Sequence, residues 1–252
     1  MIVIVLIIFV AGLILGSLLN VLVVRLPRER AIGGWPRCTR CGQPLHFWQV
    51  LPLVGWLAQF GQARCCNKRL HWIYPVVELL CGAALVAFYM RYGLSTSFFY
   101  LACVTAVLAL TGAIDWLHRS IYTLFILVPA LLAVGVSFAI PNLGLIASVI
   151  GALVAGFTFL ILFMLARILF PAKAAPFGLG DVYLGIFIGA AVGINNMMPA
   201  LFYGIVLAGL FAAGILLLRR TGRANLPEYL SYGSFLCLGT LGFLAAQGLP
   251  SV

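Results

Sequence analysis

The sequence predicts an all-α polytopic membrane protein with about eight spanning helices. Of its 252 residues, 64% are hydrophobic and only 8% are charged, and long apolar runs recur to the end of the chain. A soluble domain of this size needs a more polar surface. A spanning helix needs about 20 apolar residues. Candidate runs lie at 2–24, 74–92, 97–116, 121–140, 144–168, 182–194, 197–218 and 229–248, of which the fifth is long and the sixth short.

The first run, 2–24, predicts a membrane helix rather than a cleavable signal peptide. No basic residue precedes it, and it is long enough to span. The basic residues that follow it place the next connection inside the cell. With eight spans, the N-terminus and the C-terminus are both expected outside.

The distribution of positive charge agrees with this topology. The predicted inside segments are 25–73, 117–120, 169–181 and 219–228, and every Lys and Arg except Arg91 lies in or beside one of them. The net charge of +10 therefore reflects membrane topology and attraction to anionic lipid head groups. We expect lipids as partners, and no nucleic acid.

Three segments are expected along the chain. Residues 1–24 form the first transmembrane helix. Residues 25–73 form the one long polar insertion, rich in Arg, Gly, Pro, Trp and Cys, and we interpret it as a small cytoplasmic Cys-containing domain. Residues 74–252 form a seven-helix membrane domain, whose short connections make neighbouring helices antiparallel.

Two acidic residues are candidates for catalysis. Asp115 lies at the inner end of the third span and Asp181 at the inner start of the sixth, so both are expected at one depth on one side of the membrane. A carboxylate there is costly unless it pairs, faces water or does chemistry. Two neighbouring carboxyl groups do not both ionise easily, so one can act as general base and the other as general acid.

Each aspartate also has a simpler interpretation. Asp181 follows Gly178-Leu179-Gly180, whose glycines allow a tight turn or a close approach, and Asp is a favoured helix N-cap. Asp115 lies four residues before Arg119, a spacing that favours an ion pair on one helix face, and His118 is also near.

At the level of the whole protein, a proton-coupled transporter or channel is the alternative from another class. A transporter site usually lies near the midplane, between inverted repeats. The predicted depth of the two aspartates and the lack of a repeat in the sequence disfavour it.

The polar insertion carries two groups of cysteines, Cys38-X-X-Cys41 and Cys65-Cys66. In a reducing compartment this pattern favours metal binding over disulfides. Four thiolates would complete a tetrahedral zinc site that stabilises a small domain. Neighbouring ligands strain a chelate, so His71 or His46 is an alternative fourth ligand, and a metal-free loop is the other interpretation.

The chain resembles the type IV prepilin peptidases, the GxGD membrane aspartic proteases also called leader peptidase/N-methyltransferases. The resemblance covers nearly the whole chain and rests on an Asp, a gap and Gly-X-Gly-Asp within eight predicted spans. The matching segments are Gly16-Ser17-Leu18-Leu19-Asn20-Val21, Arg25-Leu26-Pro27, Cys38-Thr39-Arg40-Cys41, Tyr74-Pro75-Val76-Val77-Glu78-Leu79 and Gly178-Leu179-Gly180-Asp181.

The resemblance implies a function. The family cleaves the basic leader of prepilins or pseudopilins at the cytoplasmic face of the bacterial inner membrane, which would make both termini periplasmic. It then methylates the new N-terminus with S-adenosylmethionine. Asp115 and Asp181 fall on the two catalytic positions. Glu78 lies at a helix entry associated with methyl transfer, with an ion pair to Arg69 or Arg25 as the alternative role.

Several positions depart from the family pattern. The second cysteine pair would fall at positions 63 and 66, and position 63 is Ala63. The Pro-Asn expected after the first aspartate is absent, because Ile121 is followed by Tyr122-Thr123. Tyr183 replaces a Lys, and Ser231-Tyr232-Gly233-Ser234 replaces Pro-Phe-Gly-Pro. An inactive relative that binds pilin-like helices is therefore a further alternative.

Overall fold

The computed structural model forms two compact units, residues 1–114 and 115–252. Helix α5 (Thr96–His118) contributes most of its length to the first unit and its last turn to the second. The residues that the structure describes are 2–28, 33–38, 41–141, 143–169, 178–220 and 231–249.

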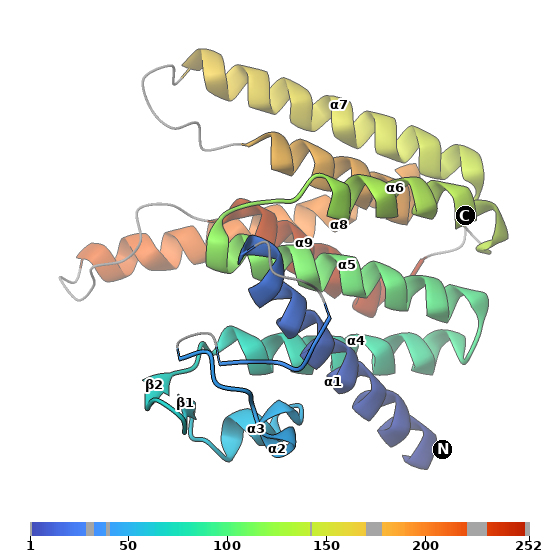
Figure 1. Ribbon diagram of the computed structural model, residues 1–252. Helices are drawn as coiled ribbons and strands as arrows, with labels where there is room; N and C mark the ends of the chain where they lie inside the picture. The colour runs from blue at the N-terminus through green and yellow to red at the C-terminus, as the bar shows by residue number, and fades with distance from the viewer. Residues whose placement is uncertain are drawn as a thin grey trace. The chain divides into compact units, whose positions relative to one another are not determined.

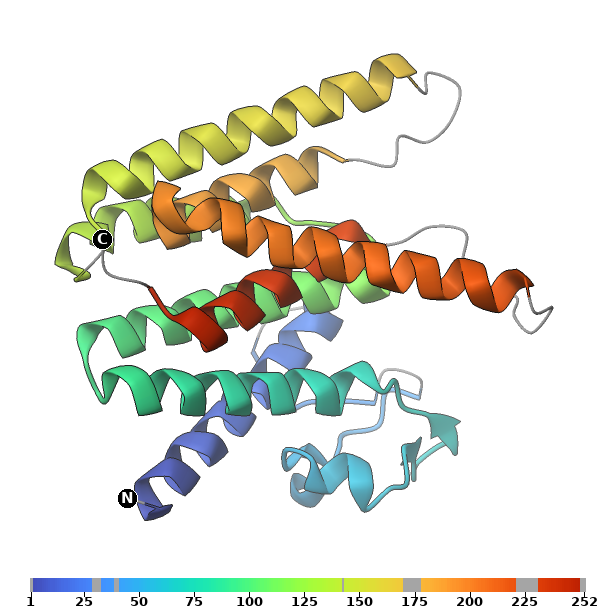
Figure 2. The same cartoon turned by 180° about the vertical axis from the view of Figure 1, so that it is seen from behind.

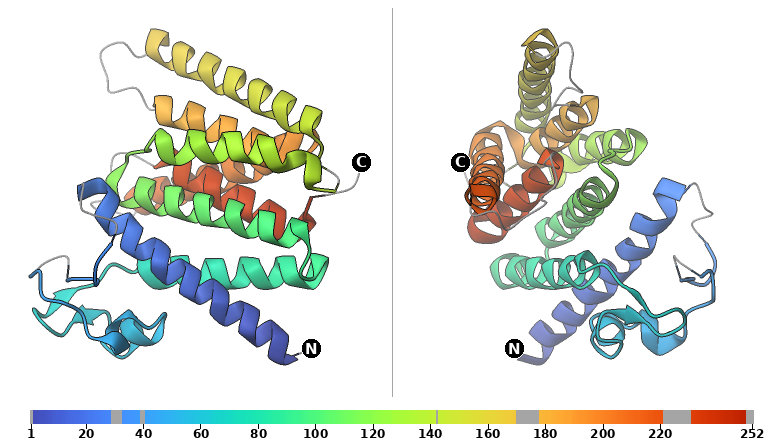
Figure 3. Two further views of the ribbon diagram at one scale, coloured as in Figure 1. Left: turned by 45° about the vertical axis from the view of Figure 1, so that its right-hand side comes forward. Right: turned by 90° about the vertical axis from the view of Figure 1, so that its left-hand side faces the viewer.

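The first unit is organised around two helices that cross, α1 (Ile2–Arg25) and α4 (Ile73–Tyr92) (Figure 1; Figure 3, left). A Cβ atom on Gly12 would lie 2.6 Å from the Cα of Gly82, and one on Gly16 would lie 2.6 Å from the Cα of Glu78. The two backbones therefore touch, as small residues allow in membrane helix pairs. This close crossing brings Asn20 of α1 next to the first turns of α4.

The polar insertion contains short elements between α1 and α4. After the 3-10 helix η1 (Leu26–Arg28) come α2 (Phe47–Val50), α3 (Val54–Leu57) and two paired strands, β1 (Gln62–Ala63) and β2 (Lys68–Arg69). A separate bridge joins Arg37 to Pro44. Each pairing closes a turn that carries two of the four cysteines. The predicted Thr39 and Arg40 of the first motif lie outside the described residues.

The second unit is a helical bundle of α6 (Leu124–Val136), η2 (Ser137–Ala139), α7 (Leu145–Leu169), α8 (Leu179–Arg220) and α9 (Tyr232–Gln247). Backbone contacts join its helices. Any side chain at Gly189 of α8 would collide with the carbonyl of Gly151 on α7, and any side chain at Gly239 of α9 would collide with the backbone of Gly204 on α8.

Helix α8 covers two of the predicted runs. The sequence predicts spans at 182–194 and 197–218, and the 42 residues of α8 form two helical halves that meet at a kink at Gly193. Gly193 has φ 74° and ψ 167°, a conformation that is essentially restricted to glycine. Figure 2 shows the two halves of α8 running in different directions. The break between the two predicted spans is therefore a kink within α8.

The prediction of an all-α membrane protein with about eight helices is confirmed. In the described part of the chain, α1 with η1, α4, α5, α7 and α8 are each long and apolar enough to cross a membrane. The helices of α6 with η2 and of α9 are apolar but shorter. With α8 divided at Gly193, these segments match the eight predicted runs in order.

Candidate functional site

Asp115 is buried at the end of α5, with 7% of its surface exposed. Its Oδ2 atom accepts two hydrogen bonds from Ser234 in the first turn of α9, from the backbone N–H at 2.8 Å and from the hydroxyl at 3.0 Å. Nearby, Trp116 and Phe235 stack edge to face with ring centroids 6.0 Å apart. The carboxylate on α5 is thus held by α9, more than 100 residues further along the chain.

The alternative partner of Asp115 does not hold its side chain. Among the described residues, Arg119 forms no ion pair with Asp115; the backbone N–H of Arg119 donates to the carbonyl of Asp115 at 2.9 Å. Arg119 has φ 53°, a left-handed conformation that ends the helix. The i, i+4 spacing therefore marks the end of α5 rather than a salt bridge.

Asp181 is buried near the start of α8, with 8% of its surface exposed. Its Oδ2 atom accepts a hydrogen bond from the N–H of Gly178 at 3.0 Å, and its own N–H donates to the carbonyl of Gly178 at 3.1 Å. Since α8 begins at Leu179, Asp181 is not the N-cap residue that one interpretation predicts. It lies within the first turn and its carboxylate reaches back to cap a free N–H.

The structure brings the two aspartates into one neighbourhood. The side chain of Ile121 fills the space beside two glycines: a Cβ atom on Gly180 would lie 2.6 Å from Ile121 Cβ, and one on Gly233 would lie 3.2 Å from Ile121 Cδ1 and 3.0 Å from Asp115 Oδ2. The Asp115 and Asp181 carboxyl groups are near enough to interact electrostatically. The glycine in front of Asp181 is thus needed for close packing.

Three residues of this neighbourhood had no predicted role in the sequence analysis. Ser234 binds Asp115, Tyr232 interacts electrostatically with Asp181, and Ile121 separates the glycines. Tyr232 and Ser234 occupy positions that depart from the family pattern, and Ile121 directly precedes another departure, Tyr122-Thr123. These departures were the available signal.

The four predicted cysteines form one cluster (Cys38, Cys41, Cys65 and Cys66), and their sulfur atoms all lie within 4.8 Å of one another. The separations are 3.9 Å for Cys38–Cys66, 3.2 Å for Cys41–Cys65 and 3.9 Å for Cys65–Cys66. Zinc–sulfur bonds of about 2.3 Å in a tetrahedron require sulfur separations of about 3.8 Å. The cluster therefore fits a metal ion of this kind.

Both neighbouring cysteines reach the cluster because the turn between β1 and β2 is tight. The N–H groups of Cys66 and Asn67 both donate to the carbonyl of Ala63, at 3.2 and 2.8 Å, and Asn67 has φ 50°. Ala63 itself is buried outside the cluster. Hydrogen bonding to Cys41 raises the pKa of the Cys65 thiol to about 12.

The histidines offered as alternative ligands lie elsewhere within the described part of the chain. His71 accepts a hydrogen bond from the N–H of Ile73 at 3.2 Å through Nδ1 and stacks on Trp72, and burial lowers the pKa of His71. His46 caps the short helix α2. Neither joins the group of possible ligands.

Glu78 lies one turn into α4, buried with 7% of its surface exposed. One carboxylate oxygen accepts the N–H of Leu53 at 2.8 Å, and the other accepts Nδ2 of Asn20 at 3.2 Å. The alternative ion pair with Arg69 or Arg25 is not formed among the described residues. Arg25 donates instead to the carbonyls of Gly33 and Gly34, each at 2.7 Å.

The structure thus has a multi-helix membrane fold, two buried aspartates at helix ends and a cluster of four cysteines in the polar insertion. Comparison with known proteins identifies the family. The model of the bacterial peptidase A24 N-terminal domain matches residues 10–92, and the model of the type IV leader peptidase family matches residues 102–213. The chain belongs to the type IV leader peptidase family.

Curated relatives agree over most of the chain. A prepilin leader peptidase/N-methyltransferase of Dickeya chrysanthemi is 31% identical over 92% of this chain and 89% of its own length. One from Bacillus subtilis is 28% identical over 93% of this chain and 91% of its own. One from Myxococcus xanthus is 33% identical over 86% of this chain, which spans 64% of that relative. No solved structure matches.

Proposed function

We propose that this protein is an aspartic endopeptidase that cleaves the leader peptide of prepilins or pseudopilins, with Asp115 and Asp181 as its catalytic pair. The observation that carries the proposal is the meeting of two buried carboxyl groups from α5 and α8. Among the described residues neither carboxylate forms a salt bridge, although the charge of Arg119 acts on Asp115. Buried acids in membrane segments are retained for function. Family membership supplies the reaction class.

The chemistry follows from the shared environment of the two groups. Two close carboxyl groups hold one proton between them. The ionised group removes a proton from a water molecule, which attacks the scissile carbonyl carbon, and the protonated group donates its proton to the leaving amine. The hydrogen bonds from Ser234 and Gly178 fix one oxygen of each carboxylate.

The basic leader and the orientation of the chain are parts of the same proposal. The distribution of positive charge supports an orientation with residues 25–73 and the aspartate pair on the cytoplasmic side of the bacterial inner membrane and both termini in the periplasm. The apolar substrate helix would lie beside the enzyme's own spans, and its basic leader near the anionic membrane surface.

The first unit is proposed to carry the second activity, transfer of a methyl group to the new N-terminus. The relatives' name, N-methyltransferase, supports this assignment, and S-adenosylmethionine would supply the methyl group. Glu78 is the acid that we place at that site. The cysteine cluster would hold one zinc ion through Cys38, Cys41, Cys65 and Cys66, and its role there would be to fix the polar insertion.

Co-expression of the full chain with a prepilin substrate tests the proposal. Intact mass of the substrate reports both loss of the leader and gain of a methyl group. We expect a shortened, methylated product with the unchanged chain, and no shortened product with Asp115→Asn or Asp181→Asn. Thr105→Val is the matched control, because Thr105 is a buried polar residue of α5 whose hydroxyl donates to the carbonyl of Leu101 at 2.8 Å. Cleavage that persists in both aspartate variants would contradict the proposed mechanism.

A further inference from the structure

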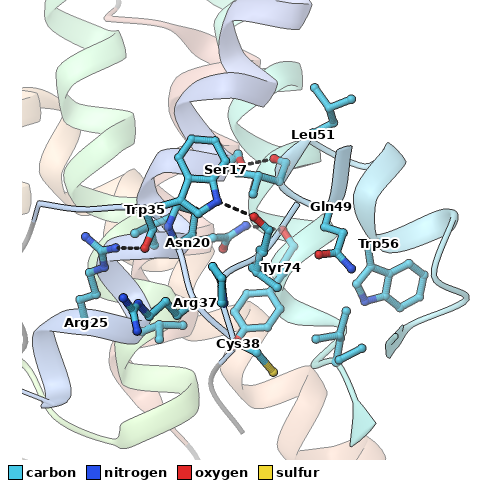
Figure 4. A pocket seen from close by; sticks show the side chains of 18 of the residues that line it. Ser17, Asn20, Arg25, Trp35, Arg37, Cys38, Gln49, Leu51, Trp56 and Tyr74 are labelled. Atoms are coloured by element: carbon cyan, nitrogen blue, oxygen red, sulfur yellow. Dashed lines mark hydrogen bonds between the residues drawn. The ribbon is translucent and has the colours of Figure 1, made fainter. Parts of the chain in front are cut away.

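A cavity of about 520 Å³ lies in the first unit, between α1, α4 and the polar insertion. Figure 4 shows Asn20 and Tyr74 next to each other in this cavity, with Arg25 and Arg37 toward one edge and Trp56 toward the other. Glu78 also lines it. Its size is within the range of small-molecule sites, which are mostly apolar with a few placed polar groups.

The orientation of the Asn20 side chain is fixed by its neighbours. Its Nδ2 group donates to the carbonyl of Tyr74 at 3.0 Å and to the Glu78 carboxylate at 3.2 Å. Both partners are acceptors, so the amide nitrogen must face them and the amide oxygen must face away.

The oxygen that remains has no partner. Asn20 is 9% exposed, and within the described residues its Oδ1 atom is buried without a hydrogen-bond donor. A buried acceptor without a donor destabilises the folded protein. Such an atom on the wall of a cavity indicates a ligand that brings an N–H or O–H group.

Glu78 adds a carboxyl group beside that oxygen. Its two carboxylate oxygens each accept one hydrogen bond from an uncharged donor, Leu53 N–H or the Asn20 amide. In the described part of the chain no Lys, Arg or His side chain pairs with it. A buried carboxylate is stable when a cation or further donors compensate it. A ligand group that satisfies both Asn20 Oδ1 and Glu78 would therefore be a positively charged hydrogen-bond donor.

The aromatic residues of the wall suit the same kind of group. Trp35 and Tyr74 line the cavity, and the Trp35 indole N–H donates to the carbonyl of Leu45, which fixes its ring. Aromatic faces attract ammonium and sulfonium cations. The Arg25 guanidinium does not occupy this place, because it donates hydrogen bonds to the carbonyls of Gly33 and Gly34.

We propose that Asn20 Oδ1 and the Glu78 carboxylate form a binding site for a primary ammonium group, with Trp35 and Tyr74 as its apolar walls. The proposal rests on the proposed methyl transfer, in which two molecules carry such a group. One is the methyl donor, through its amino acid end, and the other is the newly exposed N-terminus that accepts the methyl group. Both present the same chemistry to Asn20 and Glu78.

Equilibrium binding to the full chain in lipid nanodiscs tests the site with two probes. The first is S-adenosylhomocysteine, compared with 5′-methylthioadenosine, which lacks the amino acid end. The second is a short apolar peptide with a free N-terminus, compared with the same peptide after N-acetylation. We expect one probe of the two to bind at least about tenfold more tightly than its own control, as a hydrogen-bonded charge requires. Whichever probe does so identifies the source of the amine.

Two variants then locate the binding. Asn20→Leu removes the unpartnered oxygen, and Glu78→Gln removes the charge at nearly constant shape; each is expected to weaken the bound probe about tenfold or more. Asn196→Leu is the matched control, because Asn196 is a buried asparagine in the second unit whose Nδ2 donates to the carbonyl of Val192 at 3.1 Å. We expect it to leave probe affinity unchanged. If Asn20→Leu fails to insert, Glu78→Gln alone decides.

The outcomes separate this proposal from the proposed function. Binding is measured without turnover, so loss of peptidase activity leaves the test intact. The ammonium site is overturned if neither probe is preferred over its control, or if both variants bind the preferred probe as the unchanged chain does. A chain that binds as expected and cleaves nothing would contradict the peptidase alone.

Discussion

Buried carboxylates occur in both units, and their surroundings differ. Asp115 and Asp181 interact electrostatically, and Ile121 packs closely against two glycines beside them. Glu78 instead lines a cavity beside an amide oxygen that has no partner among the described residues. All three acids are about equally buried. Burial alone therefore does not distinguish their roles, whereas their neighbours do. Each aspartate has a second carboxyl group nearby, and Glu78 has a cavity and the unpartnered Asn20 Oδ1 atom.

Replacing either aspartate is the strongest test of the difference between the two sites. Asp115→Asn and Asp181→Asn are each expected to lower the cleavage rate by about 10² to 10⁴, the usual contribution of a general acid or base. The initial rate on purified prepilin, with insertion checked by thermal unfolding, measures the effect. A drop that tracks unfolding instead would move the aspartates to a structural role.

Glu78→Gln is expected to give the second largest effect, on methylation rather than on cleavage. We expect methylation of the product to fall about tenfold or more, because the charge beside the cavity is lost. Cleavage should stay near that of the unchanged chain, since the hydrogen bonds of Glu78 go to Asn20 and Leu53 and not to Asp115 or Asp181. The ratio of methylated to unmethylated product is read by mass. Uncleaved substrate would instead assign Glu78 to the peptidase site.

Metal content sharpens the comparison further, since the cysteine cluster belongs to the first unit. Purified chain is expected to carry about one zinc ion, and Cys38→Ser to lose it. Cys81→Ser is the control, because Cys81 is buried within α4 and outside the cluster. The Cys65 pKa of about 12 means that the metal displaces protons, so affinity should fall as pH falls. Elemental analysis against pH measures both effects; equal metal in the two variants would exclude the cluster as the site.

Ser234→Ala is expected to have the smallest effect. It removes the hydroxyl hydrogen bond to Asp115 and keeps the one from the backbone N–H. We expect kcat to fall by a few-fold, or about 1 kcal/mol, with KM unchanged. Ser234→Thr should restore kcat because it retains a hydroxyl. If KM changes and kcat does not, Ser234 acts on substrate binding rather than on Asp115.

The sequence predicts the helices well because a membrane imposes one length and one composition on them. It also predicts which cysteines gather, because their spacing already implies two turns. It predicts a break between the spans 182–194 and 197–218, but not that the break is a kink at Gly193, because the φ of that residue depends on tertiary packing. For the same reason Ser234 was missed as a partner of Asp115, since the contact joins positions 119 residues apart.

Asn20 shows the other limit of a sequence. It belongs to a recognisable segment, yet nothing in its identity says which of its polar atoms is satisfied. That property arises from the crossing of α1 and α4, where Gly16 allows the backbones to touch and the amide nitrogen to meet two acceptors. The orphaned oxygen exists only in three dimensions.

The kink in α8 affects which positions of this helix can accept substitutions during evolution. The half before Gly193 is held against α7 through Gly189 and Ser148, whose hydroxyl donates to the carbonyl of Ala190 at 2.6 Å. The half after it is held against α9 through Gly204. Because the two halves pack on different helices, we expect substitutions in the later half to leave the position of Asp181 unchanged. Gly193 itself is the position where this freedom ends, since every other residue type would be strained there.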